Sequence, residues 1–302
     1  MLDILYNFVT PWAKANKLQI LVNRLLGKVA NVIYPIWCKS KPISPGDRVN
    51  DGRECEIIVS LTSYPARIEK VALCVQSILR QSMSANRVIL WLAEEQFPDH
   101  NLPFELSQLV SDKFEIRYCD DLRSYKKIFY TAQEFCDAII ITADDDTLYP
   151  ENWLAGLYET SLEYQNMIVC YRAHEIVLDG CGCPVEYVLW NDLSPDMKGP
   201  SNNLVAIGVG GILYPRGFFE DVDFNYEIIK KLCPSTDDLW LKAIEMLKDI
   251  PVVKVCTNSK EWFTINDTQM TRLTASNVGE NVNDKSFRAL MDYYQLKFDN
   301  KG

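Results

Sequence analysis

The stretch AIIITADDDTLYP (residues 138–150) decides the fold of this chain of 302 residues. Its first six residues are apolar except for one threonine, and an apolar run of this length predicts a strand buried on both faces. Three aspartates follow the run directly. In open α/β sheets, ligands bind beyond the carboxyl ends of the strands, so a functional site is expected at these aspartates.

Short strands alternate with helices upstream of this stretch. The predicted strands cover residues 56–62, 87–92, 114–119 and 138–143, and the predicted helices cover residues 66–81, 103–111 and 125–136. This alternation is typical of an α/β fold with a mostly parallel central sheet flanked by helices. The second half of the chain is less regular. It has predicted strands at 168–172, 185–189 and 252–256 and a helix at 235–248, capped by Ser235 or Thr236.

The composition is that of a globular protein with an acidic surface. Hydrophobic residues make up 48% of the chain and charged residues 24%, and the formal net charge is -10. Because phosphate contacts need clustered Lys and Arg, no nucleic-acid partner is expected. No run approaches the roughly 20 apolar residues that span a bilayer. The ten cysteines include no CxxC pair, which favours a reducing cytoplasm and argues against structural zinc.

The first 42 residues differ from the rest of the chain. They hold six Lys or Arg residues against the single acid Asp3. Their apolar residues recur at helical spacing, which predicts a basic amphipathic helical extension over 1–42. Such a helix lies in a membrane interface, or packs on its own domain or on another subunit, and these alternatives stay open. Residues 41–53 contain two prolines and two glycines, so a linker is predicted at 43–53.

The three aspartates are the strongest chemical signal in the chain. Adjacent carboxylates repel one another, and desolvating them without a counter-charge is costly. Oxygen ligands at this density suit Mg²⁺ or Mn²⁺, which commonly take one or two protein carboxylates and complete their shell with phosphate oxygens and water. The alternative is a solvated acidic turn that caps a helix beginning near Pro150.

Six segments together resemble the GT-A-fold nucleotide-sugar glycosyltransferases, and more closely the bacterial enzymes of capsule, O-antigen and exopolysaccharide clusters. These segments are VSLTSYPARI (59–68), VILWL (88–92), YKK (125–127), IITADDDTLYP (140–150), GVGGILYP (208–215) and DDLWL (237–241). The resemblance covers residues 55–285. It implies a GT-A domain at 54–285, followed by a C-terminal helix or tail at 286–302.

The resemblance also implies roles for individual residues. Those assigned to nucleotide-sugar binding are Thr62, Tyr64, Arg67, Asp121, Lys126, Asp144, Asp145, Gly210 and Gly211. Tyr64 is suited to stack on a base and Arg67 to approach a diphosphate. Glycines allow close backbone approach to a sugar. Asp146, with Asp144, is assigned to the metal.

A second acidic pair, Asp237 and Asp238, resembles the catalytic pair of inverting GT-A enzymes, in which the second acid is the general base. That role falls to Asp238, because a carboxylate there can take the proton of an acceptor hydroxyl. The alternative is plain helix capping, since acids in a first helical turn are favoured by the macrodipole.

The resemblance therefore implies a metal-dependent glycosyltransferase that uses Mn²⁺ or Mg²⁺. It would move a sugar from a nucleoside-diphosphate donor, expected to be UDP-linked, to a saccharide acceptor in cell-surface polysaccharide synthesis. A lipid-linked acceptor and the basic extension would place it at the cytoplasmic face of the cell membrane. Two alternatives stay open: a sugar-phosphate nucleotidyltransferase, and a non-catalytic saccharide-binding or scaffold subunit. The oligomeric state is also open.

Overall fold

A seven-stranded sheet forms the centre of the computed structural model, which describes residues 1–11, 15–41, 43, 53, 55–193, 197–256, 261–268 and 281–298. Its order is β3-β2-β1-β4-β8-β5-β9. The strands are β1 (Ile57–Thr62), β2 (Arg87–Ala93), β3 (Phe114–Cys119), β4 (Ile139–Thr142), β5 (Ile168–Cys170), β8 (Ile212–Tyr214) and β9 (Val252–Lys254). Only β8 runs antiparallel to its neighbours, so the mostly parallel α/β fold is confirmed.

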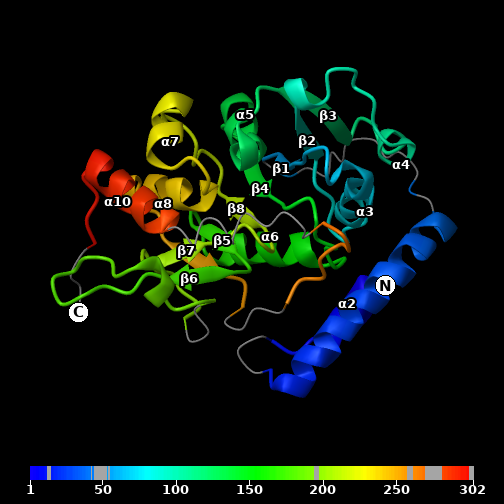
Figure 1. Cartoon of the computed structure of the whole chain (residues 1–302), viewed down its shortest axis with the longest axis horizontal. Helices are drawn as coiled ribbons and strands as arrows, with labels where there is room; N and C mark the ends of the chain where they lie inside the picture. Colours follow the sequence, from blue (N-terminus) through cyan, green and yellow to red (C-terminus); the bar gives the residue numbers. More distant parts are fainter. Residues whose placement is uncertain are drawn as a thin grey trace.

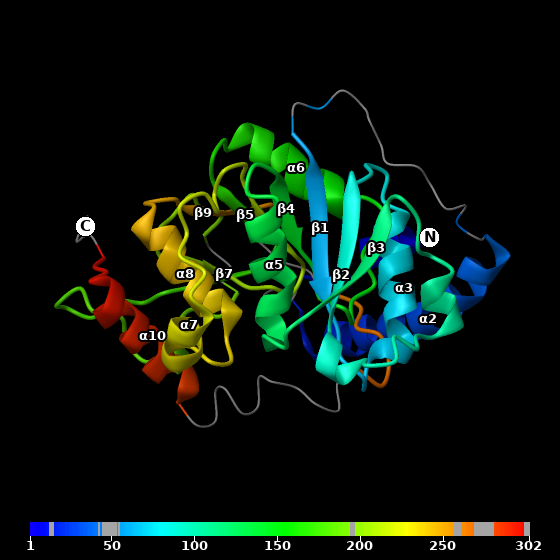
Figure 2. The same ribbon diagram turned by 90° about the horizontal axis from the view of Figure 1, so that it is seen from above.

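Helices cover both faces of this sheet (Figure 2). They are α1 (Leu2–Asn7), α2 (Lys17–Ser40), α3 (Ile68–Leu79), α4 (Phe104–Ser107), α5 (Lys126–Glu134), α6 (Trp153–Glu163), α7 (Tyr226–Leu232), α8 (Asp237–Leu247) and α10 (Val282–Tyr294). Side chains alternate along β1 because of its period of two. Val59 and Leu61 join the core with α3 and α6, whereas Ser60 faces α5 and bonds Thr131 at 2.7 Å.

The N-terminal helices are part of this core. Leu2 and Tyr6 of α1 and Ala30 and Tyr34 of α2 are at most 5% exposed. The extension is therefore helical, as predicted, and one of its sides packs on its own domain. Most of the predicted linker at 43–53 lies outside the described residues. None of the described helices has the length and apolar character needed to cross a bilayer.

The second half of the chain departs from the sequence prediction in several places. The strand predicted at 185–189 is wrong: residues 187–189 form a short 3₁₀ turn, because the Tyr187 N–H donates to the Asp284 carboxylate of α10 and not to a neighbouring strand. The prediction also missed β8 and the small antiparallel sheet of β6 (Ala173–Glu175) and β7 (Leu204–Ala206). The predicted domain boundary at 285/286 falls inside α10.

Candidate functional site

The three aspartates after β4 turn to different partners. Asp145 points inward, where it accepts hydrogen bonds from Ser63 at 2.5 Å and from Arg67 at 2.7 Å. Arg67 also pairs with Asp146 at 3.1 Å. Asp144 pairs with Lys127 of α5 at 3.2 Å. The triplet is therefore a folded part of the site, with each carboxylate oriented by a cation, and not a solvated acidic turn.

Backbone pairing holds the triplet at the carboxyl end of the sheet. Ile265 donates its N–H to the Asp146 carbonyl at 2.7 Å, and Phe263 accepts from the Leu148 N–H at 2.9 Å. The Tyr6 hydroxyl of α1 joins these two segments, because it donates to the Leu148 carbonyl and accepts from the Phe263 N–H, both at 2.7 Å. The N-terminal segment thus helps to fix the loop that carries Asp146.

The second acidic pair lies next to the triplet. Asp237 and Asp238 begin α8, and the Lys127 ammonium is 3.3 Å from Asp237 as well as 3.2 Å from Asp144. The Gly208 N–H donates to Asp238 at 3.3 Å. A Cβ placed on Gly208 would lie 3.2 Å from the Lys127 nitrogen, 3.5 Å from an Asp238 oxygen and 3.6 Å from an Asp144 oxygen. Both acidic groups therefore face one point in space.

Burial and crowded negative charge change the proton affinities at this point. Burial, followed by the charge of Asp144, raises the pKa of Asp146 to about 7. Burial and the charge of Asp237 raise the pKa of Asp238 to about 8, although Lys127 opposes the shift. Burial alone would lower the pKa of Lys127, but the Asp237 and Asp144 carboxylates outweigh it, so that pKa is raised.

The donor set fits a divalent cation that is completed by a ligand. In the described part of the chain, no group of three His, Cys, Asp or Glu side chains is arranged to hold a metal. Mg²⁺ commonly needs only one or two carboxylates, because substrate phosphates and water supply the remaining oxygens. Asp144 and Asp146 provide two such carboxylates, and the charge of Asp144 contributes, after burial, to the raised pKa of Asp146.

Several predicted nucleotide-binding residues have partners within the protein. The Thr62 hydroxyl donates to the Trp91 carbonyl at 2.8 Å. Tyr64 lies against Arg67, whose guanidinium carbon is 5.4 Å from the centre of its ring. Asp121 and Lys126 pair with each other at 2.6 Å and, within the described residues, make no hydrogen bond or ion pair with the triplet. Their contacts with a nucleotide stay predictions.

Packing alone requires glycine at residues 210 and 211. Both have positive φ, of 96° and 89°. A Cβ at Gly210 would lie 2.6 Å from the Trp262 ring, and one at Gly211 would lie 2.6 Å from the Trp153 ring. These clashes explain both glycines without a ligand, so their predicted contact with a sugar stays untested. Gly208 is the glycine that faces the two acidic groups.

Two further cations lie at the site: sequence reasoning considered Lys127, with Lys126, only as a nucleotide contact, and it gave Arg172 no role. Lys127 joins the two acidic groups, and it lies four residues before Thr131, which faces the sheet. Residues four apart lie on one helix face, so this spacing could have indicated that Lys127, like Thr131, faces the sheet. Arg172 follows β5; burial lowers the pKa of its guanidinium, and the charges of Asp192, Glu261 and, less strongly, Asp144 oppose that shift. Its Nε is buried and has no hydrogen-bond partner among the described residues, and no pattern in the sequence pointed to it.

Comparison with known proteins gives distant similarities to solved structures. No protein-family model and no curated protein matches the chain. Among solved structures, CMP:2-keto-3-deoxy-manno-octonic acid synthetase complexed with CTP aligns with 66% of this chain and 88% of its own, at 11% identity and a TM-score of 0.42. A 4-diphosphocytidyl-2C-methyl-D-erythritol synthase aligns with 77% of this chain and 100% of its own, at 12% identity and a TM-score of 0.41. The class of the fold rests on the observed strand order and not on these alignments.

Proposed function

We propose that the chain transfers a sugar from a nucleoside-diphosphate donor to a saccharide hydroxyl, with a divalent cation held by Asp144 and Asp146. One observation carries this proposal: Asp144, Lys127 and Asp238 face a common point at Gly208. A carboxylate suited to metal and phosphate chemistry therefore lies beside a separate carboxylate whose pKa is raised to about 8. Acid–base chemistry needs such distinct environments within one site.

Different residues have different roles in the proposed reaction. Asp144 and Asp146 hold the cation, which would neutralise charge on the departing nucleoside diphosphate. Lys127 keeps Asp144 and Asp237 in place. The Arg172 Nε, which has no hydrogen-bond partner within the described ranges, offers a donor to phosphate oxygens. Asp238 takes the proton from the acceptor hydroxyl as it attacks the anomeric carbon. The expected route is a single displacement with inversion.

A sugar-phosphate nucleotidyltransferase is the second candidate. Arg67, Lys127 and Arg172 supply positive charge near the triplet, as a bound triphosphate would need. However, a phosphate nucleophile is already ionised near neutral pH, since its second pKa is about 6, and it needs no general base. The raised pKa of Asp238 therefore favours a hydroxyl nucleophile.

Product analysis separates these candidates. The chain is incubated with Mn²⁺ and a panel of nucleotide-sugars plus saccharide acceptors, and in parallel with CTP or UTP plus sugar phosphates. We expect release of nucleoside diphosphate, with UDP-sugars as donors, and loss of this release in EDTA. Release of pyrophosphate would establish the nucleotidyltransferase instead. Saccharide binding without either product would support the non-catalytic alternative.

We further propose that α2 contacts an anionic membrane, where a lipid-linked acceptor would be met. Large apolar side chains on α2 are exposed on the side away from the core, and Figure 1 shows α2 along one edge of the molecule. This exposed apolar face consists of Leu18, Leu21, Val22, Leu25, Val32, Ile33 and Ile36. Lys17, Arg24, Lys28 and Lys39 are also exposed, and α2 contains no acid. Apolar area flanked by basic charge is complementary to anionic lipid.

Point substitutions test this contact, because deleting the extension would also remove core residues such as Tyr6. L25D/I36D should lower partitioning onto phosphatidylglycerol-containing vesicles at least about tenfold, since each side chain contributes about 1.5–3 kcal/mol when fully buried. Vesicle co-sedimentation measures the effect, with F104D/V110D as the matched control at two apolar positions exposed elsewhere. Two results would contradict membrane binding. One is equal sedimentation of the two variants; the other is a dimer of the parent chain that L25D/I36D dissociates and F104D/V110D does not.

A further inference from the structure

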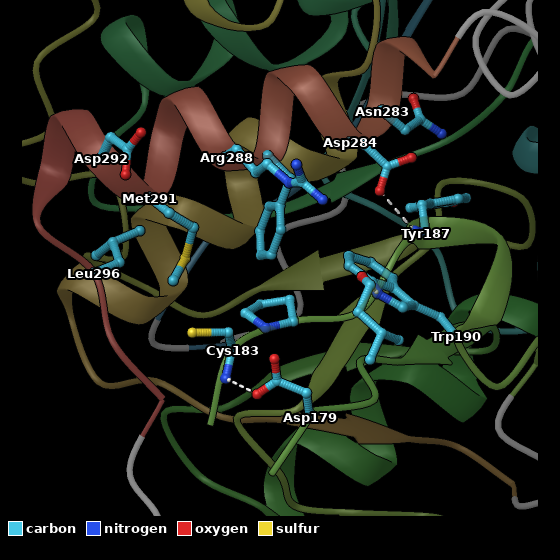
Figure 3. Close-up of a pocket in the computed structure, with 13 residues that line it drawn as sticks. Asp179, Cys183, Tyr187, Trp190, Asn283, Asp284, Arg288, Met291, Asp292 and Leu296 are labelled. Carbon is cyan, nitrogen blue, oxygen red and sulfur yellow. Dashed lines mark hydrogen bonds between the residues drawn. The ribbon is translucent and has the colours of Figure 1, made fainter. Parts of the chain in front are cut away.

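A cavity of about 470 Å³ lies between the segment 179–190 and α10 (Figure 3). Cys183, Tyr187 and Trp190 line it from the segment side, and Asp284, Arg288 and Met291 are among the residues that line it from α10. Its volume is within the range of small-molecule sites, which is roughly 300–1,000 Å³. The metal and base residues proposed above are not in its lining.

The walls combine aromatic rings with hydrogen-bonding groups. Trp190 lies between Tyr187 and Phe287, with ring centres 4.7 Å and 5.3 Å apart. Asp284 accepts the Tyr187 N–H through one carboxylate oxygen at 2.8 Å, and Asn283 lies beside it in the lining. Amphipathic rings that pack against a ligand, together with carboxylate and amide groups that orient it, suit a sugar ring with an apolar face and peripheral hydroxyls.

The charge of the lining selects among sugars. Three acids, Asp179, Asp284 and Asp292, line the cavity against one cation, Arg288. Excess negative charge disfavours an anionic ligand, because like charges brought together in a partly desolvated site repel. A neutral or amine-bearing ring fits this lining, whereas a uronic acid or a phosphorylated sugar does not.

A hydrogen bond links the wall of the cavity to the start of the helix that carries the proposed catalytic base. Thr236, the residue before Asp237 and Asp238, donates its hydroxyl to Asn283 of the cavity wall at 3.0 Å. Tyr187 of the opposite wall is close enough to Asp238 for the charge of that carboxylate to act on its hydroxyl. The start of α8 is thus hydrogen-bonded to the α10 side of the cavity, and the charge of Asp238 reaches Tyr187 on the other side.

From this arrangement we infer that the cavity binds a sugar ring of the acceptor and accepts only rings without negative charge. The role of this sugar as the acceptor rests on the proposed transfer reaction. Saccharide binding by the cavity does not depend on catalysis. The inference makes the 179–190 segment and α10 the part of the chain that selects the acceptor.

Thiol protection tests the inference without requiring turnover. Cys181 and Cys183 are both exposed, but only Cys183 lines the cavity, so Cys181 serves as the internal control. Alkylation by iodoacetamide is followed at both thiols by peptide mass spectrometry, with N-acetylglucosamine, glucosamine or glucuronic acid as the added probe. At a probe concentration equal to its Kd, the rate at Cys183 should fall about twofold. The neutral and amine-bearing sugars should give this protection, and glucuronic acid should not.

A substitution at an exposed residue of the lining separately tests whether the cavity selects sugars by their charge. Asp292 is exposed and is not part of the proposed catalytic machinery. D292K would leave two acids and two cations in the lining, so it should abolish the charge discrimination and let glucuronic acid protect Cys183. Equal alkylation rates with every probe, or protection by glucuronic acid in the parent chain, would overturn the inference. Protection in a chain that transfers no sugar would reject the proposed function alone, and transfer without protection would reject the cavity assignment alone.

Discussion

Replacing Asp146 with asparagine should reduce sugar transfer at least about 100-fold, because even outer-shell partners of a metal typically contribute 10–100-fold to affinity or activity. The folded chain should stay as stable as the parent. Since burial and the charge of Asp144 raise the pKa of Asp146 to about 7, the folded chain holds this carboxyl protonated below that pH, and its ionisation above that pH costs stability. A neutral amide of the same shape relieves this repulsion. Arg67 keeps its pair with Asp145 at 2.7 Å.

The measurements are turnover at saturating Mn²⁺ and the rise of Tm with added Mn²⁺ and nucleotide-sugar. The parent should show this rise, because a ligand that binds only the folded state stabilises it. D146N should lose it. D145N is the matched control: Asp145 accepts hydrogen bonds from Ser63 and Arg67 in the interior, so its loss should lower the free energy of unfolding by about 1–3 kcal/mol. A D146N protein with parental turnover would reject the metal assignment.

Replacing Asp238 with asparagine should lower kcat by about 10²–10⁴-fold, which is the usual contribution of a positioned general base. Donor binding should persist, because the Gly208 N–H can still donate to the amide oxygen of asparagine and the triplet is unchanged. Donor affinity is measured by titration calorimetry and turnover by nucleoside-diphosphate release. A D238N protein that turns over like the parent would exclude the base role.

The pH dependence of kcat/KM tests the same role of Asp238 as the general base. A general base acts when deprotonated, and the pKa of Asp238 is raised to about 8, so kcat/KM should fall as the pH drops below that value and level off above it. Asp237 contributes to the elevation through its charge. D237N should therefore move the profile toward lower pH. A profile that D237N leaves in place would show that another group controls the rate.

The first half of the fold was predictable because local patterns and tertiary structure agree there. The runs at 56–62, 87–92 and 138–143 are apolar and rich in β-branched residues, and each forms a buried strand within about a residue of its predicted ends. The second half was less predictable because its strands are only three residues long, as in β8, and are stabilised by pairing between distant segments.

The candidate site, like the fold, was only partly predictable from the sequence. The sequence marked Asp144–Asp146 and Asp237–Asp238, since acids next to a buried strand or at a helix start are visible as local patterns. It did not reveal that Lys127 lies between the two groups, because that requires the register of α5 on the sheet. It also did not show that Asp145 is hydrogen-bonded to Ser63 and Arg67 in the interior.

Sequence alone determined the parallel sheet, the carboxylates at its edge and the amphipathic character of the first 42 residues, because strand burial and helix faces follow from periodicity along the chain. The folded structure was needed to show which cation pairs with each aspartate, that both acidic groups meet at Gly208, and that α2 buries one side while exposing an apolar other side. Charge pairing, proton affinity and exposure depend on distances between residues far apart in sequence, and folding sets those distances.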